Sequence, residues 1–124
     1  MIVRRMCQQL ALPVEIVAAE TVRDEDGLAL SSRNRYLSAS ERQVAPVIYR
    51  TLKECAAKIA AGAPVAAVLD YGKTAMARTG LQVDYLEARN ADTLAPLGAV
   101  VGEPIRLLAA ARIGTTRLID NIAV

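Results

Sequence analysis

The sequence predicts an α+β fold in which two helices pack on a three-stranded antiparallel sheet, with a separate helix–strand unit in front of them. Between residues 38 and 79, apolar residues recur every three or four positions, which is typical of amphipathic helices. From residue 81 onward, strand-like runs alternate with turns that contain Pro and Gly. Residues 2–17 read as a short amphipathic helix followed by an apolar strand, which is half of an α/β unit.

The leading unit is expected to consist of a helix over residues 2–11, which Pro13 stops, and a strand over residues 14–17. No strand comes before the helix in the sequence. A strand of an α/β unit needs neighbouring strands, so we expect that this unit is the remnant of a larger domain.

The first of the two central helices is expected to begin at Ser38, because Ser38 and Glu41 have the spacing of a capping box. It should reach about Ala61, with a kink or a tightened first turn at Pro46, which lacks an amide donor. The second helix is expected over residues 64–79, opening on a proline and closing before a glycine.

Three strands are expected after the helices, over residues 81–89, 104–112 and 117–124. The last two are separated only by a short Gly-Thr-Thr turn, so they should form a hairpin. Antiparallel pairing of all three strands follows from such short connections.

Composition limits the classes of function. The chain has 124 residues, of which 53% are apolar and 3% aromatic, and its net charge is +2. That size indicates one domain or part of a larger protein. The low charge, scattered arginines and few aromatic side chains argue against a nucleic-acid partner. No signal peptide or apolar run of membrane-spanning length is visible, so we expect a cytoplasmic protein without a membrane partner.

Histidine is absent from the chain, and its two cysteines, Cys7 and Cys55, lie far apart in apolar helical patterns. The missing histidine excludes a Ser–His or Cys–His nucleophile pair and a His-ligated metal within these residues. The cysteines lack the Cys-x-x-Cys spacing, so buried reduced thiols are expected rather than a disulfide.

The stretch from residue 20 to residue 37 is the strongest candidate for a functional site. Ser31, Ser32, Arg33 and Asn34 place hydroxyl, guanidinium and amide donors in one turn, a set suited to binding an oxyanion. An alternative is a solvated loop in which Ser and Asn satisfy backbone groups ahead of a helix.

Two other polar clusters are interpreted as structural. The run from Arg23 to Asp26 contains three carboxylates that could suggest a metal, but the other ligands of a calcium loop are missing, so an acidic turn in water is favoured. Arg117, Asp120 and Asn121 are expected to form a polar face on the last strand.

Residues 22–37, V-R-D-E-D-G-L-A-L-S-S-R-N-R-Y-L, resemble the R-E-x-D-G-L-A-M-S-S-R-N-x-Y-L signature of the pantoate–β-alanine ligase family. The runs V-D-Y-L-E-A-R at 83–89, A-D-T-L at 91–94 and A-A-R-I-G-T-T-R-L-I-D-N at 110–121 are similar to that family's C-terminal strands. The resemblance covers essentially the whole chain.

The resemblance implies an enzyme that joins pantoate to β-alanine with ATP and Mg²⁺, through a pantoyl-adenylate, releasing AMP and pyrophosphate. Residues 1–22 would then be the remnant of a Rossmann-like nucleotide-binding domain. Residues 23–37 would be a hinge and phosphate-binding loop, and residues 38–124 a C-terminal lid domain.

The same resemblance implies site residues. Val22 would contact adenine through its backbone, and Leu30, Ser31, Ser32 and Arg33 would bind the phosphates, with the two hydroxyls and the guanidinium stabilising the pyrophosphate. The family's His-x-Gly-His motif and its metal ligands are not in this chain, so we expect the chain alone to be inactive. The alternative is a folded, non-catalytic lid module that self-associates as a homo-oligomer.

Overall fold

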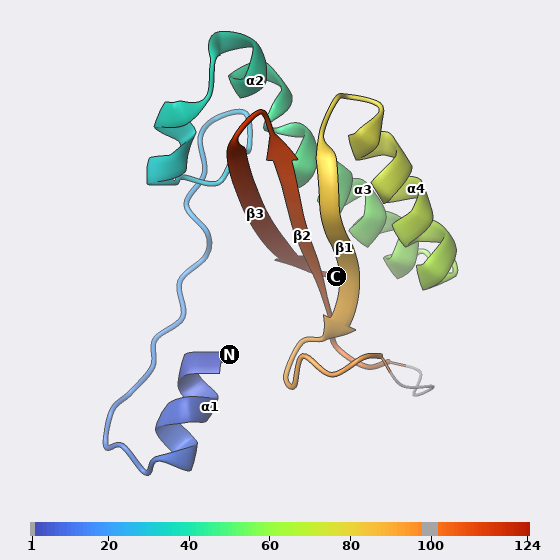
Figure 1. The fold of residues 1–124 in the computed structure, drawn as a ribbon. Coiled ribbons are helices and arrows are strands. Elements are labelled where there is room, and N and C mark those ends of the chain that lie inside the picture. The colour runs from blue at the N-terminus through green and yellow to red at the C-terminus, as the bar shows by residue number, and fades with distance from the viewer. Residues whose placement is uncertain (1, 98–101) are drawn as a thin grey trace.

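The computed structural model describes residues 2–97 and 102–124 and confirms the α+β class (Figure 1). The elements, in chain order, are α1 (Ile2–Gln9), the 3-10 helix η1 (Ser32–Tyr36), α2 (Ala39–Val44), α3 (Val47–Ala60), α4 (Val65–Ala77), β1 (Gln82–Asn90), β2 (Ile105–Ile113) and β3 (Thr116–Ala123).

The capping box is confirmed at the start of α2. The Ser38 hydroxyl accepts a hydrogen bond from the Glu41 amide at 3.3 Å, and the Glu41 carboxylate accepts one from the Ser38 amide at 2.8 Å. The single kinked helix expected from Ser38 to Ala61 is wrong in one respect, because the chain breaks into α2 and α3 with Pro46 as the N-cap of α3. Pro46 cannot donate a helical hydrogen bond, so it begins a helix rather than continuing one.

The three strands form one antiparallel sheet in the order β1–β2–β3, as the sequence predicts. Helices α3 and α4 lie together on one face of this sheet (Figure 1). The two-residue connection between Ile113 and Thr116 makes β2 and β3 the expected hairpin. Between helices and sheet lies the apolar core, whose largest fully buried side chains are Leu52, Cys55, Met76, Leu86 and Leu107.

The strand expected at residues 14–17 is not formed, and α1 ends at Gln9 rather than near residue 11. The described structure gives this segment no neighbouring strand, and an unpaired strand leaves its backbone groups without ladder partners. Residues 14–17 instead belong to an extended connection that joins α1 to the rest of the molecule (Figure 1).

Both cysteines are buried and unpaired, as expected. Among residues 2–97 and 102–124, none of the helices is both long and apolar enough to cross a membrane.

Candidate functional site

The segment ahead of η1 is a small hairpin rather than an open loop. The Leu30 amide donates to the Val22 carbonyl and the Asp24 amide donates to the Leu28 carbonyl, both at 2.9 Å. The turn closes where the Gly27 amide donates to the Asp24 carbonyl at 2.9 Å. This pairing sets the direction in which the chain enters the Ser31–Asn34 run.

Gly27 is required at this turn for its conformation and for its lack of a side chain. Its φ is +92°, a region that side chains strongly disfavour. A Cβ built on Gly27 would lie 2.4 Å from Cδ1 of Tyr49 on α3, so the turn packs directly against that ring.

The five residues expected to bind ATP lie at the surface of this hairpin and at the start of η1. Val22 and Leu30 are 68% and 55% exposed, and Ser31, Ser32 and Arg33 are exposed as well. Ser31 is the N-cap of η1, where its hydroxyl accepts a hydrogen bond from the Arg33 amide at 3.2 Å. The structure therefore brings Leu30 to Arg33 together as one exposed turn, while Val22 lies opposite Leu30 in the hairpin.

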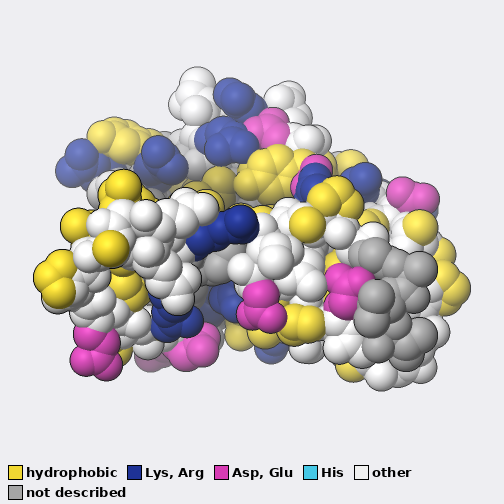
Figure 2. All heavy atoms as spheres, turned by 90° about the horizontal axis from the view of Figure 1, so that it is seen from below, with side chains coloured by type: hydrophobic (Ala, Val, Ile, Leu, Met, Phe, Trp, Pro, Cys, Tyr) yellow, Lys and Arg dark blue, Asp and Glu magenta, His cyan; other side chains and the backbone are white. Residues whose placement is uncertain are grey.

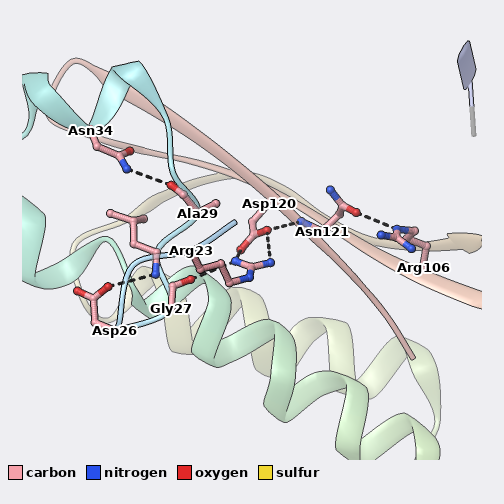
Figure 3. A network of polar contacts seen from close by, with 9 residues as sticks. Arg23, Asp26, Gly27, Ala29, Asn34, Arg106, Asp120 and Asn121 are labelled. Atoms are coloured by element: carbon pink, nitrogen blue, oxygen red, sulfur yellow. Dashed lines mark hydrogen bonds and ion pairs between the residues drawn. The ribbon is translucent and has the colours of Figure 1, made fainter. Parts of the chain in front are cut away.

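Asn34 joins η1 to the hairpin, because its side-chain amide donates to the Ala29 carbonyl at 3.0 Å. Its other polar atom, Oδ1, is buried without a hydrogen-bond partner. The Asn34 side chain thus closes the turn that carries Ser31 to Arg33 (Figure 3).

A cavity of about 280 Å³ lies between this turn and β3. Leu30, Ser31 and Arg33 line it from one side, and Asp120 and Asn121 from β3. Arg33 also lines a neighbouring groove together with Tyr36 and residues 115–117 of the β2–β3 hairpin. The candidate site is thus a surface shared by the hairpin–η1 segment and the last strand.

An ion pair that the sequence analysis missed joins these two parts (Figure 3). The Arg23 guanidinium donates to both Asp120 carboxylate oxygens, at 2.7 and 2.9 Å, and also to the Gly27 carbonyl at 3.1 Å. The hydrogen bonds that Arg23 donates to the Asp120 carboxylate raise the pKa of Arg23 above its ordinary value, so this guanidinium stays charged. A signal was available, because Asp120 is two positions from Leu118 and from Ile122, so the three side chains share one face of the strand, which the apolar pair predicts to be the core face.

The acidic turn lies at the surface, and two of its three carboxylates pair with an arginine of α2. Arg42 pairs with Asp24 at 2.8 Å and with Asp26 through a short contact. The hydrogen bond from Arg42 lowers the pKa of the Asp26 carboxyl. Within residues 2–97 and 102–124, no three His, Cys, Asp or Glu side chains gather as a metal site would require.

The chemical capacity of the turn follows from these contacts. Two hydroxyls and a guanidinium are exposed together, and the described ion pairs occupy other arginines, so Arg33 is positioned to meet an anion. A guanidinium fork with neighbouring hydroxyl donors matches the geometry of a phosphate group.

Comparison with known proteins shows the family to which the chain belongs. A model of the pantoate-beta-alanine ligase family matches residues 1–123. The chain belongs to the pantoate–β-alanine ligase family. Two curated members of that family are pantothenate synthetases from Rhodopseudomonas palustris (strain ATCC BAA-98 / CGA009), 54% identical, and Bradyrhizobium sp. (strain BTAi1 / ATCC BAA-1182), 52% identical, each over 123 residues.

The chain spans less than half the length of these pantoate–β-alanine ligase relatives, since the alignments cover 99% of the chain but 44% of each relative. A crystal structure of pantothenate synthetase from Thermus thermophilus matches 97% of the chain and 44% of its own chain, with 45% identity and a TM-score of 0.86. A pantoate-beta-alanine ligase from Francisella tularensis, complexed with beta-gamma ATP and beta-alanine, matches 98% of the chain and 38% of its own, with a TM-score of 0.66; at 24% identity this likeness shows the fold alone.

Proposed function

We propose that this chain is the C-terminal part of a ligase that condenses pantoate and β-alanine to pantothenate with ATP, through a pantoyl-adenylate, giving AMP and pyrophosphate. The observation that carries the proposal is the exposed turn from Leu30 to Arg33, which contains the first three residues of the family's S-S-R-N signature and exposes two hydroxyls and a guanidinium beside a paired hairpin. Pantothenate synthetases that are 50% identical or more support the reaction class.

Within that reaction, the turn would form one wall of the ATP site. The Val22 backbone would meet adenine, while Leu30, Ser31, Ser32 and Arg33 would surround the phosphates. The hydroxyls of Ser31 and Ser32 and the Arg33 guanidinium would stabilise charge on the departing pyrophosphate, which is the largest electrostatic change in forming an acyl-adenylate. Donors fixed before the reaction stabilise such charge without reorganising.

The proposal divides the chain into three parts. Residues 1–22 would belong to the nucleotide-binding domain, residues 23–37 would form the hinge and phosphate-binding loop, and residues 38–124 would form the lid. The pantoate contacts, and the ligands for the Mg²⁺ that accompanies ATP, are proposed to lie outside this chain, since the described residues offer no cluster that suits a metal.

Arg33→Ala tests the phosphate role directly. We expect the wild-type chain to bind ATP and inorganic pyrophosphate weakly, and Arg33→Ala to weaken both by about ten-fold, because a charge-assisted hydrogen bond contributes about 1.5–3 kcal/mol. Adenosine binding should not change. Isothermal titration calorimetry measures all three affinities.

Arg35→Ala is the matched control for Arg33→Ala. Arg35 lies in the same 3-10 helix, but its guanidinium donates to the Tyr36 hydroxyl at 2.9 Å instead of standing free. The Arg35→Ala variant should bind pyrophosphate with the affinity of the wild-type chain. Equal losses in both variants would show that only general positive charge attracts the anion, and would contradict the specific role of Arg33.

The purified chain alone should form no pantothenate from pantoate, β-alanine and ATP. It contains no histidine and therefore lacks the His-x-Gly-His motif that the family resemblance implies for holding the nucleotide. Mass spectrometry of the reaction mixture checks this result. Pantothenate formed by the isolated chain at a rate above that of a blank would overturn the assignment of the remaining machinery to another part of the enzyme.

A second candidate is the non-catalytic lid module that self-associates. It is favoured by apolar side chains left at the surface of α1 and the following connection, among them Ile2, Leu10, Val14 and Val17. Figure 2 shows apolar side chains at the surface on the side of the molecule that holds α1. Several exposed apolar side chains on one side of a molecule favour association.

A further inference from the structure

Two segments that lie far apart in the sequence meet at one largely buried ion pair. Arg23 and Asp120 are 97 positions apart, yet both carboxylate oxygens of Asp120 receive hydrogen bonds from the Arg23 guanidinium. Only 15% of the Arg23 side chain and 5% of the Asp120 side chain are exposed. Such a pair is shielded from solvent, in contrast to the partly exposed pairs of Arg42 with the acidic turn.

Asp120 lies on the face of β3 that covers the core. It is paired in register with Ala109, and Leu118 and Ile122 share its face of the strand. A carboxylate in this position is costly unless it is paired and hydrogen-bonded. The Asp120 carboxylate accepts hydrogen bonds from the Arg23 guanidinium and from the backbone amide of Asn121, the latter at 2.7 Å.

Arg23 is in turn held from three directions. Besides Asp120, it donates to the Gly27 carbonyl at 3.1 Å, and its guanidinium lies 3.8 Å from the centre of the Tyr49 ring on α3. Stacking on an aromatic face and a bidentate ion pair together fix the plane of a guanidinium. The Arg23 side chain is thus wedged between the hairpin turn, α3 and β3 (Figure 3).

Fixing Arg23 also fixes the phosphate-binding turn. The Arg23 backbone is bridged to Ala29, which is one residue before Leu30, and the Ala29 carbonyl accepts the hydrogen bond from Asn34. On the sheet side, Asn121 accepts a hydrogen bond from Arg106 of β2 at 2.8 Å. A continuous chain of polar contacts therefore runs from β2, through β3, to the turn (Figure 3).

We propose that Arg23 and Asp120 are positioning residues that anchor residues 28–34 to β3, so that the phosphate-binding turn moves as one body with the C-terminal sheet. Neither side chain needs to touch a phosphate for this role. The mechanical part of the proposal stands on the contacts above, and its consequence for phosphate affinity rests on the proposed function. Any closure of the sheet over a nucleotide would carry Ser31, Ser32 and Arg33 with it.

Amide hydrogen exchange of the chain, followed by NMR, tests the anchor without any ligand. In Asp120→Asn, the amides of Leu28, Leu30 and Asn34 should exchange about ten-fold faster or more, because the segment then opens without losing the core. Amides of the β1–β2 ladder should keep their protection. The wild-type Arg23 guanidinium should show resolved Nη proton resonances, the sign of hindered rotation, and these should merge in the variant.

Asp84→Asn is the matched control, because Asp84 is another aspartate of the sheet that pairs with arginines, but at an exposed site. It should leave the exchange of residues 28–34 and the Arg23 resonances unchanged. Unchanged exchange at these amides in Asp120→Asn, with the Nη resonances still resolved, would overturn the anchor.

Arg23→Lys keeps the test decisive if Asp120→Asn fails to fold. Lysine retains the charge but cannot form the two-pronged contact, so the same three amides should again exchange faster. Full protection in Arg23→Lys would overturn the bidentate anchor, because charge alone would then suffice.

Pyrophosphate titration separates the anchor from the proposed function. If the anchor and the phosphate role are both correct, Arg23→Lys should lower the affinity for inorganic pyrophosphate several-fold although Arg33 is intact. If the amides exchange faster in Arg23→Lys but the wild-type chain binds no pyrophosphate, the anchor is supported and the phosphate role is contradicted. Weaker pyrophosphate binding without faster exchange would overturn the anchor while leaving the phosphate role in place.

Discussion

At the scale of single residues, the geometry of the candidate site depends on Gly27 as well as on polar side chains. The residue turns the hairpin at positive φ and leaves room for the Tyr49 ring, on which the Arg23 guanidinium stacks. Without that close approach, Arg23 would lose the surface that orients it toward Asp120. The position of the turn from Leu30 to Arg33 therefore depends on the absence of a side chain at Gly27.

Gly27→Ala should destabilise the chain by more than the cost of its backbone conformation. An alanine at positive φ costs about 1–2 kcal/mol, and the overlap with Tyr49 should add about 1–3 kcal/mol. Gly62→Ala is the control, since Gly62 has a φ of +89° but no atom within 4 Å of the added Cβ. Urea denaturation measures the loss of unfolding free energy in each of the two variants. Equal losses in Gly27→Ala and Gly62→Ala would contradict the role assigned to the Tyr49 contact.

At the scale of elements, a bulge in β1 ties the sheet together across its three strands. The register shifts between Val83 and Tyr85, which leaves Asp84 without a paired residue on β2. Its carboxylate accepts hydrogen bonds from Arg117 of β3 at 2.6 Å and from Arg112 of β2 at 3.3 Å. A bulge re-aims a side chain, and here it directs one carboxylate to an arginine of the adjacent strand β2 and to an arginine of β3, which lies beyond β2.

Asp84 should stabilise the fold only above acidic pH. The hydrogen bond from Arg117, with a further contribution from Arg112, lowers the pKa of Asp84 in the folded chain. The unfolded chain, with a pKa of about 3.9, then binds the proton more readily. The stabilisation is therefore complete above about pH 4 and is lost as pH falls through the lower, folded pKa.

Thermal unfolding from pH 7 to pH 2 measures this effect as the difference in Tm between wild type and Asp84→Asn. The difference should be largest near neutral pH, shrink in acid, and also shrink in high salt, because the pair is exposed. Asp92→Asn, which removes a surface carboxylate outside the bridge, is the control. A Tm difference that stays constant down to pH 2 would contradict the argument.

At the scale of the whole molecule, the sequence predicts the layers well and the contacts between distant segments poorly. Periodicity and caps are local properties, so the helices and the β2–β3 hairpin could be derived from them. The strand at 14–17 could not be judged in this way, because a strand depends on partners that its own residues do not specify.

The candidate site shows the same division. Ser31 to Arg33 could be chosen from donor chemistry and family resemblance, and the structure places them in one exposed turn. The sequence places Arg23 and Asp120 in two separate polar clusters, because no local pattern indicates that residues 97 positions apart will meet. Strand alternation could have shown that Asp120 faces inward and needs a cation, but not which cation.

Self-association is the prediction that belongs to the entire chain. Multi-angle light scattering should give a mass above that of one chain at high concentration, because apolar side chains of α1 and the connection are exposed. The double variant Leu10→Ser/Val17→Ser should shift the mass toward the monomer, whereas Ile119→Ser, at an exposed position of β3, should not. A clean monomer for the wild type would count against the module as a self-associating unit.

The contact between Arg23 and Asp120 also sets an order of events during synthesis. A ribosome makes Arg23 first and must add 97 more positions before Asp120 exists. Until β3 emerges, the nascent chain lacks the Asp120 carboxylate that pairs with Arg23. Long-range contacts of this kind form late. The proposed anchor can therefore form only after β3 has been translated, and a ribosome that stalls before β3 leaves the turn without it.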